Sequence, residues 1–207
     1  GDYLELTKNA DFSNGFTFEI YANLERWDYD NGSNKKGQGM FCKIPSLLYS
    51  DNGKAMRFGA TESRIGKFYG HSSWAGAGEN LSTSYNGDVF VDDYGYNINE
   101  DFFLTLVYRR YDDNSPQWEE KADKVEYYIN GNLSGYTYYG IDSYDTGLKT
   151  WNNSNSHFYL GVCPWWSSGN LYYLKGNVYC TRLYERDLNG EEIKENVNKT
   201  KIYRNLN

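Results

Sequence analysis

Apolar and polar residues alternate along residues 16–24, and this alternation predicts a β-strand. The apolar set is Phe16, Phe18, Ile20, Ala22 and Leu24. The intervening set is Thr17, Glu19, Tyr21 and Asn23. Because successive side chains of a strand point to opposite sides of its sheet, we expect the first set to pack into a core. A buried face backed by a polar one is typical of antiparallel sheets.

Further strand signals follow in the middle of the chain. Residues 102–108 are apolar on both faces apart from Thr105, which predicts a central strand. The dipeptide Asn130-Gly131 separates two apolar runs. Both of its residues tolerate positive φ, so it predicts a tight hairpin. Residues 89–91 predict a short strand inside a long loop.

A short helix is predicted to begin near Gly190. Asn189 is a favourable N-cap residue, and Glu192 three residues later completes the spacing of a capping box. Ile193 and Val197 are four positions apart, so they share one side of the helix. We expect that side to lie on a sheet.

Residues 174–184, just before this helix, predict the last strand. Val178 and Cys180 share one phase of the alternation, whereas Leu183 is in the other. A β-bulge near Thr181 would reconcile the two phases.

This closing segment resembles the last strand and small helix of laminin-G-like, concanavalin A-like lectin–glucanase domains. The matching residues are Gly176, Val178, Arg182, Leu183, Tyr184, Leu188, Glu191, Glu192 and Ile193. Five earlier segments are similar to the family's strands in the same order, residues 3–6, 16–22, 103–108, 125–133 and 158–161. Cys180 stands where the family often has an acidic residue.

The resemblance implies an all-β fold, a two-sheet antiparallel jelly-roll sandwich with one short C-terminal helix. It implies a single domain over residues 1–207. The chain begins with Gly-Asp rather than Met, so we expect a domain excised from a larger protein. The expected core residues are Phe18, Ile20, Leu104, Leu106, Ile129, Leu160 and Val178.

Composition agrees with a folded β protein. The aromatic share is 18%, with 22 tyrosines, and aromatic residues favour strands. Disordered chains are poor in aromatic residues. The net charge of −7 argues against a nucleic-acid partner, which needs clustered Lys and Arg. The sequence has no apolar run long enough for a membrane span.

The three cysteines are widely spaced and lie in strand-like contexts. They are interpreted as small buried apolar residues. The alternative is a disulfide between Cys163 and Cys180, provided that their strands are neighbours, with Cys42 as a free thiol.

Catalytic chemistry is not indicated. Glucanases of this fold need carboxylates at alternate positions of one strand, and their Glu-x-Asp-x-x-Glu motif is absent. The nearest acidic cluster is Glu119, Glu120, Asp123 and Glu126. Asp123 and Glu126 are three positions apart, hence on opposite faces of a strand, and the cluster is interpreted as a solvated charged turn. We therefore expect no enzyme, and a glycoside hydrolase is the least favoured alternative.

Aromatic residues in or beside long loops predict a ligand site. Flat rings stack on the apolar side of a pyranose, while polar groups hydrogen-bond its hydroxyls. The predicted ligand-binding residues are Trp27, Tyr29, His71, Trp74, Asp92, Tyr94, Trp165 and Trp166. The alternative is that these rings cap the ends of the sandwich.

Calcium is a candidate cofactor. Asp28 and Asp30 could supply oxygen ligands, although the loop lacks full EF-hand spacing, and so could residues 112–114. Many members of the family that the chain resembles bind calcium. Ordinary Asp- and Asn-rich turns are the alternative for both segments.

The resulting hypothesis is a non-catalytic recognition module, most simply a carbohydrate-binding one, in a secreted or cell-surface multidomain protein. Its expected partners are a glycan or another cell-surface ligand and other domains of the parent chain. The alternative is a structural or adhesion domain that contacts protein. Both uses occur within the family, and fold does not decide between them.

Overall fold

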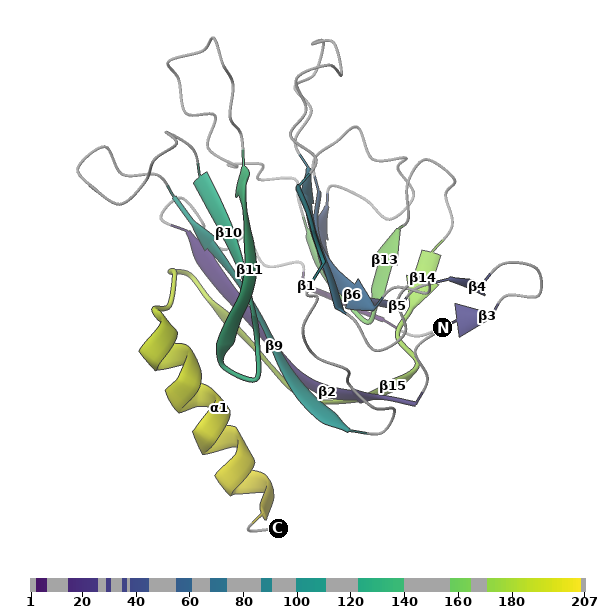
Figure 1. Ribbon diagram of the computed structural model, residues 1–207. Coiled ribbons are helices and arrows are strands. Elements are labelled where there is room, and N and C mark those ends of the chain that lie inside the picture. The colour runs from purple at the N-terminus through teal and green to yellow at the C-terminus, as the bar shows by residue number, and fades with distance from the viewer. Residues whose placement is uncertain are drawn as a thin grey trace, which may run out of the picture.

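Two antiparallel sheets face each other, and one helix lies outside them (Figure 1). The computed structural model describes residues 3–6, 15–25, 29–30, 35–36, 38–44, 55–60, 68–73, 87–90, 100–110, 123–139, 157–164 and 171–205. The six-stranded sheet has the order β1 (Leu4–Leu6), β12 (His157–Leu160), β5 (Gln38–Ile44), β6 (Ala55–Ala60), β7 (Phe68–Ser73) and β8 (Gly87–Phe90). The five-stranded sheet has the order β11 (Asn132–Tyr139), β10 (Asp123–Ile129), β9 (Asp101–Arg109), β2 (Phe16–Leu24) and β15 (Gly176–Tyr184).

Two small ribbons and the helix complete the described structure. The ribbons are β3 (Tyr29–Asp30) with β4 (Lys35–Lys36), and β13 (Val162–Pro164) with β14 (Leu171–Tyr173). The helix α1 spans Gly190–Asn205. The predicted all-β, two-sheet antiparallel sandwich with one C-terminal helix is therefore confirmed. No helix in the described ranges is long and apolar enough to cross a membrane.

The main core lies between the two sheets. Its buried residues are Phe16, Phe18, Ile20, Ala22, Leu24, Met40, Phe102, Leu104, Leu106, Tyr108, Val125, Tyr127, Ile129 and Phe158. Phe158 of the six-stranded sheet stacks on Phe18 of the other sheet, with ring centroids 5.8 Å apart, and meets Phe16 edge-on at 5.2 Å. These rings join the two layers by apolar burial and ring contact.

Six of the seven predicted core positions contribute to this core. The fully buried ones are Phe18, Ile20, Leu104, Leu106 and Ile129. Leu160 is partly buried against the same cluster. The prediction for Val178 is wrong, because its side chain is 36% exposed. Val178 lies on β15, which is an edge strand of the five-stranded sheet among the described residues.

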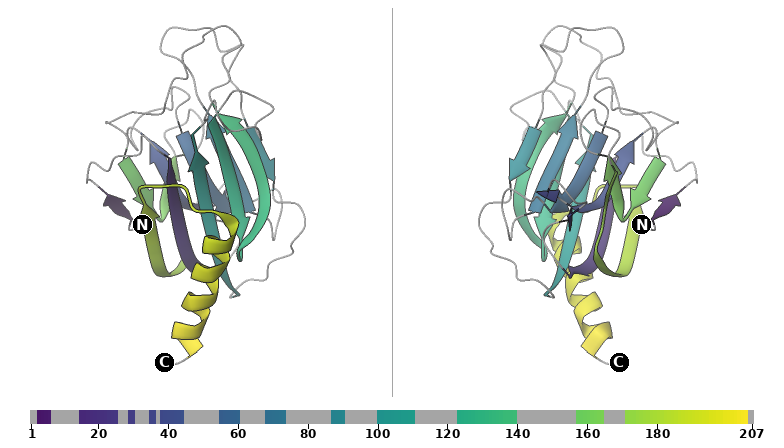
Figure 2. Two further views of the ribbon diagram at one scale, coloured as in Figure 1. Left: turned by 90° about the vertical axis from the view of Figure 1, so that its left-hand side faces the viewer. Right: turned by 90° about the vertical axis from the view of Figure 1, so that its right-hand side faces the viewer.

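The second face of β2 is buried as well. Thr17, Glu19 and Tyr21 point away from the core, yet all three are buried. They lie on the outer face of the five-stranded sheet, across which α1 runs (Figure 2). Ile193 packs with Val107 and Tyr128 of this face. The expectation that one side of the helix lies on a sheet is thus confirmed.

The capping box at the start of α1 forms as predicted. The Asn189 Oδ1 accepts hydrogen bonds from the backbone N–H groups of Glu191 and Glu192, both at 3.0 Å. The Glu192 carboxylate accepts a hydrogen bond from the Asn189 N–H at 2.9 Å. The helix begins at Gly190, as predicted, but its 16 residues make it longer than expected.

The hairpin between β10 and β11 also forms as predicted. Asn130 and Gly131 both have positive φ, at 51° and 85°, as the tight hairpin turn requires. This turn rests against the helix. A Cβ built on Gly131 would lie 3.3 Å from Cγ of Lys194 and 3.6 Å from Cγ2 of Val197.

The irregularity in the last strand lies earlier than predicted. The register of β15 against β2 shifts between Val178 and Cys180, so the bulge is at Tyr179 rather than near Thr181. The strand begins at Gly176, where a Cβ would lie 2.0 Å from the backbone oxygen of Asn23. Only glycine therefore fits at this position without a backbone shift. The predicted strand at residues 89–91 corresponds to β8, which ends at Phe90.

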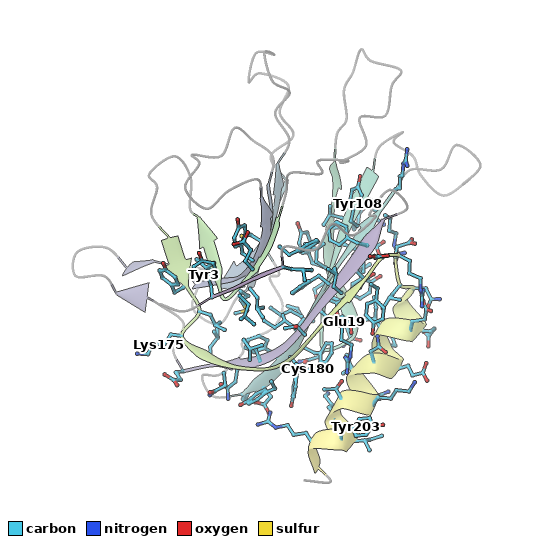
Figure 3. All side chains as sticks on the ribbon, turned by 180° about the vertical axis from the view of Figure 1, so that it is seen from behind. Tyr3, Glu19, Tyr108, Lys175, Cys180 and Tyr203 are labelled. Atoms are coloured by element: carbon cyan, nitrogen blue, oxygen red, sulfur yellow. The ribbon has the colours of Figure 1, made fainter. Side chains whose placement is uncertain are left out.

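Cys42 is a small buried residue, as predicted, whereas the alternative disulfide between Cys163 and Cys180 does not form. Cys42 is a buried free thiol, and its Sγ donates a hydrogen bond to the Val162 carbonyl at 3.3 Å. Cys180 is also free, and it lies half-buried beneath α1 (Figure 3). Cys163 lies in β13, which pairs with β14 and not with β15, so the condition for a Cys163–Cys180 disulfide is not met.

Candidate functional site

The end of β2 and the start of β13, which precede two of the predicted ligand-binding segments in the chain, meet at one corner of the sandwich. Glu25, which follows β2, donates its N–H to the Lys175 carbonyl at 3.1 Å. The adjacent Leu174 N–H donates to the Gly161 carbonyl at 2.8 Å, and Gly161 directly precedes β13. A continuous set of backbone contacts thus joins the end of β2 to the start of β13.

Trp27 follows Glu25 by two positions, and Trp165 and Trp166 follow the end of β13. A strand residue advances the chain by about 3.3 Å, so the three residues of β13 separate its ends by less than about 10 Å. The backbone contacts thus place Glu25 near the start of β13, and Trp165–Trp166 follow the other end of this three-residue strand. Trp27, Trp165 and Trp166 themselves lie outside the described residues.

Glycine makes this corner possible. Gly161 has φ of 81°, a conformation that other residues rarely adopt, and it joins β12 to β13. Its N–H donates to the Met40 carbonyl at 2.7 Å, which holds the turn against β5. The chain can therefore leave the six-stranded sheet at Gly161 and form the separate β13–β14 ribbon.

An exposed tyrosine and a carboxylate lie on the outer side of strands β1 and β12. Tyr3 is 44% exposed, and its ring meets the ring of Tyr159 edge-on, with centroids 6.0 Å apart. The Tyr159 hydroxyl donates to Glu5 Oε1 at 3.4 Å. Figure 3 shows Tyr3 on the same side of the molecule as Lys175, far from the C-terminal end of the helix. We call Tyr3, Glu5 and Tyr159 the N-terminal cluster.

The hydroxyl of Tyr159 in the N-terminal cluster has a raised pKa. Burial of the ring, followed by the nearby carboxylate of Glu5, raises the pKa of Tyr159 to about 12. The hydroxyl therefore keeps its proton at neutral pH and donates it toward Glu5. Tyr159 thus contacts both the ring of Tyr3 and the carboxylate of Glu5.

Sequence reasoning missed the N-terminal cluster. Glu5 and Tyr159 are 154 positions apart in the chain, and they meet because β1 pairs with β12. The sequence did contain a signal, since Tyr3 and Glu5 alternate with Leu4 and Leu6. This alternation places Tyr3 and Glu5 on one face of the strand.

The other predicted ligand residues are distributed over the six-stranded sheet and one ribbon. Tyr29 lies in β3 opposite Lys36, and His71 lies in β7 opposite Arg57 and Asp88. These placements concern the backbone, since the side chains of Tyr29 and His71 lie outside the described structure.

Trp74 follows the end of β7, whereas Asp92 and Tyr94 follow β8. Strands β7 and β8 are antiparallel, with Tyr69 opposite Phe90, so they end at opposite ends of the sheet. The register therefore does not bring these two attachment points together. The residues Trp74, Asp92 and Tyr94 lie beyond the described ranges.

The predicted calcium ligands remain a prediction. Asp30 lies in β3 opposite Lys35, its side chain is not described, and Asp28 lies outside the described residues. In the part of the chain that the structure describes, no group of three His, Cys, Asp or Glu side chains is arranged to hold a metal ion.

One member of the acidic cluster near residue 120, Glu126, forms a buried ion pair, whereas Glu119 and Glu120 lie outside the described residues. Glu126 is buried in β10, where its carboxylate accepts hydrogen bonds from Arg109 Nε and the Tyr128 hydroxyl, both at 2.8 Å. Burial alone would raise the pKa of Glu126, but Lys124 and Arg109 hold it below its ordinary value. The carboxylate is therefore ionised and structurally occupied at neutral pH. The interpretation of Glu126 as part of a solvated turn is wrong.

A second buried carboxylate lies between the sheet and α1. Glu19 is fully buried, and its oxygens accept hydrogen bonds from Asn196 Nδ2 at 3.1 Å and from Arg182 Nη1 at 3.2 Å. Burial raises the pKa of Glu19, although Asn196 and Arg182 oppose the rise. The sequence pattern had placed this residue on a polar face, and only the helix that covers the face explains its burial.

The exposed ring of Tyr179 is already engaged by neighbouring side chains. The guanidinium of Arg204 lies 3.8 Å from the centre of this ring, and the ring of Tyr21 is 5.3 Å away. Arg204 also forms an ion pair with Asp101. A sugar that stacked on the covered face would have to displace Arg204. Tyr3 is therefore the better described candidate for a stacking platform.

Comparisons with known proteins establish the fold. The sequence matches no protein-family model and no curated protein. A native heptameric SAP-like pentraxin from Limulus polyphemus is 10% identical, with a TM-score of 0.53 over 93% of this chain and 73% of the pentraxin. Botulinum neurotoxin type C, whose cell entry depends on interaction with two ganglioside molecules, is 13% identical, with a TM-score of 0.50 over 90% of this chain and 36% of the toxin chain.

The NanB sialidase from Streptococcus pneumoniae is 16% identical, with a TM-score of 0.53 over 94% of this chain and 27% of the sialidase. This chain thus spans about a third of the toxin chain and about a quarter of the sialidase. At such low identity these likenesses show the fold, a jelly-roll sandwich.

Proposed function

We propose that this domain is a non-catalytic module that binds carbohydrate, within a secreted or cell-surface protein of several domains. The observation that supports the proposal is the set of backbone contacts that joins Glu25, two positions before Trp27, to Gly161 at the start of β13, the strand that precedes Trp165 and Trp166 in the chain. The ganglioside dependence of one structural neighbour is in keeping with the proposal.

The N-terminal cluster supplies the chemistry that such a site needs. The exposed ring of Tyr3 offers an apolar face, and the carboxylate of Glu5 can accept hydrogen bonds from sugar hydroxyls. The edge contact with Tyr159 fixes the ring of Tyr3, so less side-chain entropy is lost on binding. We include Tyr29, Trp27, Trp165 and Trp166 in the same proposed site.

The remaining predicted residues belong to a separate part of the proposal. His71, Trp74, Asp92 and Tyr94 are attached to β7 and β8, at the far edge of the six-stranded sheet from β1. We retain them as candidates for a second contact with an extended glycan. We also retain calcium in the proposal, with Asp28 and Asp30 as its ligands, because calcium binds carboxylate oxygens.

A glycan array with the purified domain, with and without calcium, tests the function. A matched pair of variants then tests the site by calorimetric titration of the best glycan. Tyr3→Ala should weaken binding at least about tenfold, whereas Tyr136→Ala should leave it unchanged. Tyr136 is a suitable control, because it is 50% exposed and lies on β11 in the other sheet. Both variants should keep the wild-type melting temperature.

The proposal fails if the array shows no bound glycan under either condition. The site assignment fails separately if a glycan binds and Tyr3→Ala and Trp165→Ala both leave the affinity unchanged. Loss of binding in Asp30→Ala that calcium does not restore would support the metal site.

A protein-contacting adhesion domain is the second candidate function. Leu4 is 68% exposed, Leu6 39% and Val178 36%, and they lie on edge strands of the two sheets. Exposed apolar side chains on strand edges favour protein contact. Leu4→Asp with Val178→Asp should abolish capture of a protein partner and leave glycan binding intact.

A further inference from the structure

The carboxylate of Glu5 lies on the same face as the exposed ring of Tyr3. The two residues are two positions apart, so a strand separates them by about 6.6 Å along its axis and points them the same way. Both side chains contact Tyr159, the ring of Tyr3 edge-on and Glu5 through the Tyr159 hydroxyl. A sugar that stacks on Tyr3 therefore has its hydroxyls within reach of Glu5.

The outer face of the six-stranded sheet continues beyond this pair. Tyr159 is register partner to Glu5 on one side and to Cys42 on the other, so these three residues share one face. Tyr159 is buried, and Cys42 donates to the Val162 carbonyl of the β13–β14 ribbon at 3.3 Å. Tyr3 and Glu5 are both exposed. They are thus the members of the N-terminal cluster that a ligand would meet.

The surroundings of Tyr159 disfavour additional negative charge. Burial is the largest cause of the raised pKa of Tyr159, which is about 12, and Glu5, Cys42 and Tyr3 each act in the same direction. Loss of a proton from a hydroxyl creates a negative charge, so a raised pKa shows that such a charge is unfavourable there. An anionic group of a ligand bound beside Tyr3 would meet the same opposition.

The hydrogen-bonding chemistry of Glu5 favours hydroxyl groups. A carboxylate can accept about four hydrogen bonds and donates none, so Glu5 can bind the Tyr159 hydroxyl and sugar hydroxyls at the same time. Hydrogen bonds to an ionised acceptor are stronger than those between neutral groups. The carboxylate of a sialic acid, or the sulfate of a sulfated sugar, has no proton to donate at neutral pH and is repelled by Glu5. The net charge of −7 acts in the same direction.

We propose that the N-terminal cluster selects uncharged glycans and excludes acidic ones, with Glu5 as the specificity-determining residue. This inference rests on the proposed carbohydrate-binding function and names the ligand class: neutral hexoses and N-acetylhexosamines that stack on Tyr3 and donate their hydroxyls to Glu5. Because a ganglioside is a sialylated glycolipid, the proposal takes from the ganglioside-dependent structural neighbour only the broad class of ligand, a glycan.

Matched pairs of immobilised glycans test the selection with the full chain. Each neutral glycan, such as N-acetyllactosamine, is compared with its sialylated and its sulfated form. The acidic forms should bind at least about tenfold more weakly than the neutral ones. The difference should shrink when NaCl is raised from about 0.1 M to about 1 M, because the Debye length falls from about 10 Å to about 3 Å. A difference that salt does not diminish would overturn the proposal, since charge would not be its cause.

Three variants test the assignment to Glu5. Glu5→Gln keeps the shape and removes the charge, so it should bring the affinities of the neutral and acidic forms to within about threefold of each other. Glu5→Lys should reverse their order. Glu185→Gln removes the same charge from an exposed position that follows β15 of the other sheet, so it should keep the wild-type difference. All three variants should keep the wild-type melting temperature.

Failure of this inference can be told apart from failure of the proposed function. Equal or tighter binding of the acidic forms by the wild type would overturn the inference and leave carbohydrate binding in place. The same conclusion follows if Glu5→Gln keeps the wild-type difference, or if Glu185→Gln abolishes it as completely as Glu5→Gln does. If neither neutral nor acidic glycans bind, the proposed function itself is wrong, and this inference with it.

Discussion

Replacing Thr105 by Val should stabilise this protein, although it removes a polar group from a strand. Valine has nearly the shape of threonine, with a methyl group in place of the hydroxyl. Thr105 is fully buried and its hydroxyl has no hydrogen-bond partner among the described residues, so the folded state bears the desolvation cost of that group. Mutational data put this cost at about 1–3 kcal/mol. Valine also favours strands, so the backbone of β9 accepts it.

The expected gain is therefore about 1–3 kcal/mol in the free energy of unfolding. For a domain of this size each kcal/mol raises the melting temperature by about 2–4 °C. Urea denaturation followed by Trp fluorescence measures it, with a higher midpoint and an unchanged slope as the signature.

Thr105→Ser is the matched control, since it keeps the hydroxyl and removes the methyl group. It should lower stability by about 1 kcal/mol through lost apolar burial. If Thr105→Val were instead less stable than the wild type by more than about 1 kcal/mol, the hydroxyl would have a partner and the reasoning would be refuted.

Three further predictions follow from burial, charge and backbone geometry. Burial raises the pKa of Glu19, so the folded protein binds the proton of this carboxyl group more tightly than the unfolded chain does. The free energy of unfolding should therefore fall as pH rises from 4.5 through the raised pKa. Glu19→Gln should flatten that decline in urea melts between about pH 4.5 and pH 7.5, and an unchanged slope would contradict it. Gly176→Ala should cost about 1–3 kcal/mol or more because its Cβ would meet the Asn23 carbonyl, whereas Gly190→Ala should be neutral or slightly stabilising. Equal effects in thermal melts would show that the close approach at Gly176 relaxes freely. Leu106→Ala should cost about 2–5 kcal/mol in denaturant melts and Val178→Ala less than about 1 kcal/mol, and the reverse order would show that β9 is not central.

Local signals in the sequence predicted the elements of the fold well. The hairpin at Asn130-Gly131 and the cap at Asn189 depend on residues within three positions of one another, so they can be recognised without tertiary information. The alternation in β2 predicted its core face for the same reason. The exact site of the bulge could not be predicted, because it depends on how β15 pairs with β2.

The environment of individual side chains was less predictable, because it is set by partners far along the chain. Glu19 is buried by contacts with Arg182, 163 positions away, and with Asn196, 177 positions away. Val178 is exposed because β15 lies at the edge of its sheet, and no local sequence pattern specifies which strand lies there. The N-terminal cluster of the candidate site required the pairing of β1 with β12.

The contact between the β10–β11 turn and the helix limits how this protein can be engineered. Exposed loop tips are ordinarily the places that tolerate inserted tags, fused domains or circular permutation. Gly131 lies at the tip of the β10–β11 hairpin but is buried, and an added Cβ there would lie 3.3 Å from Cγ of Lys194 and 3.6 Å from Cγ2 of Val197 in α1. An insertion at this turn would push the helix off its sheet, so fusions are better placed elsewhere.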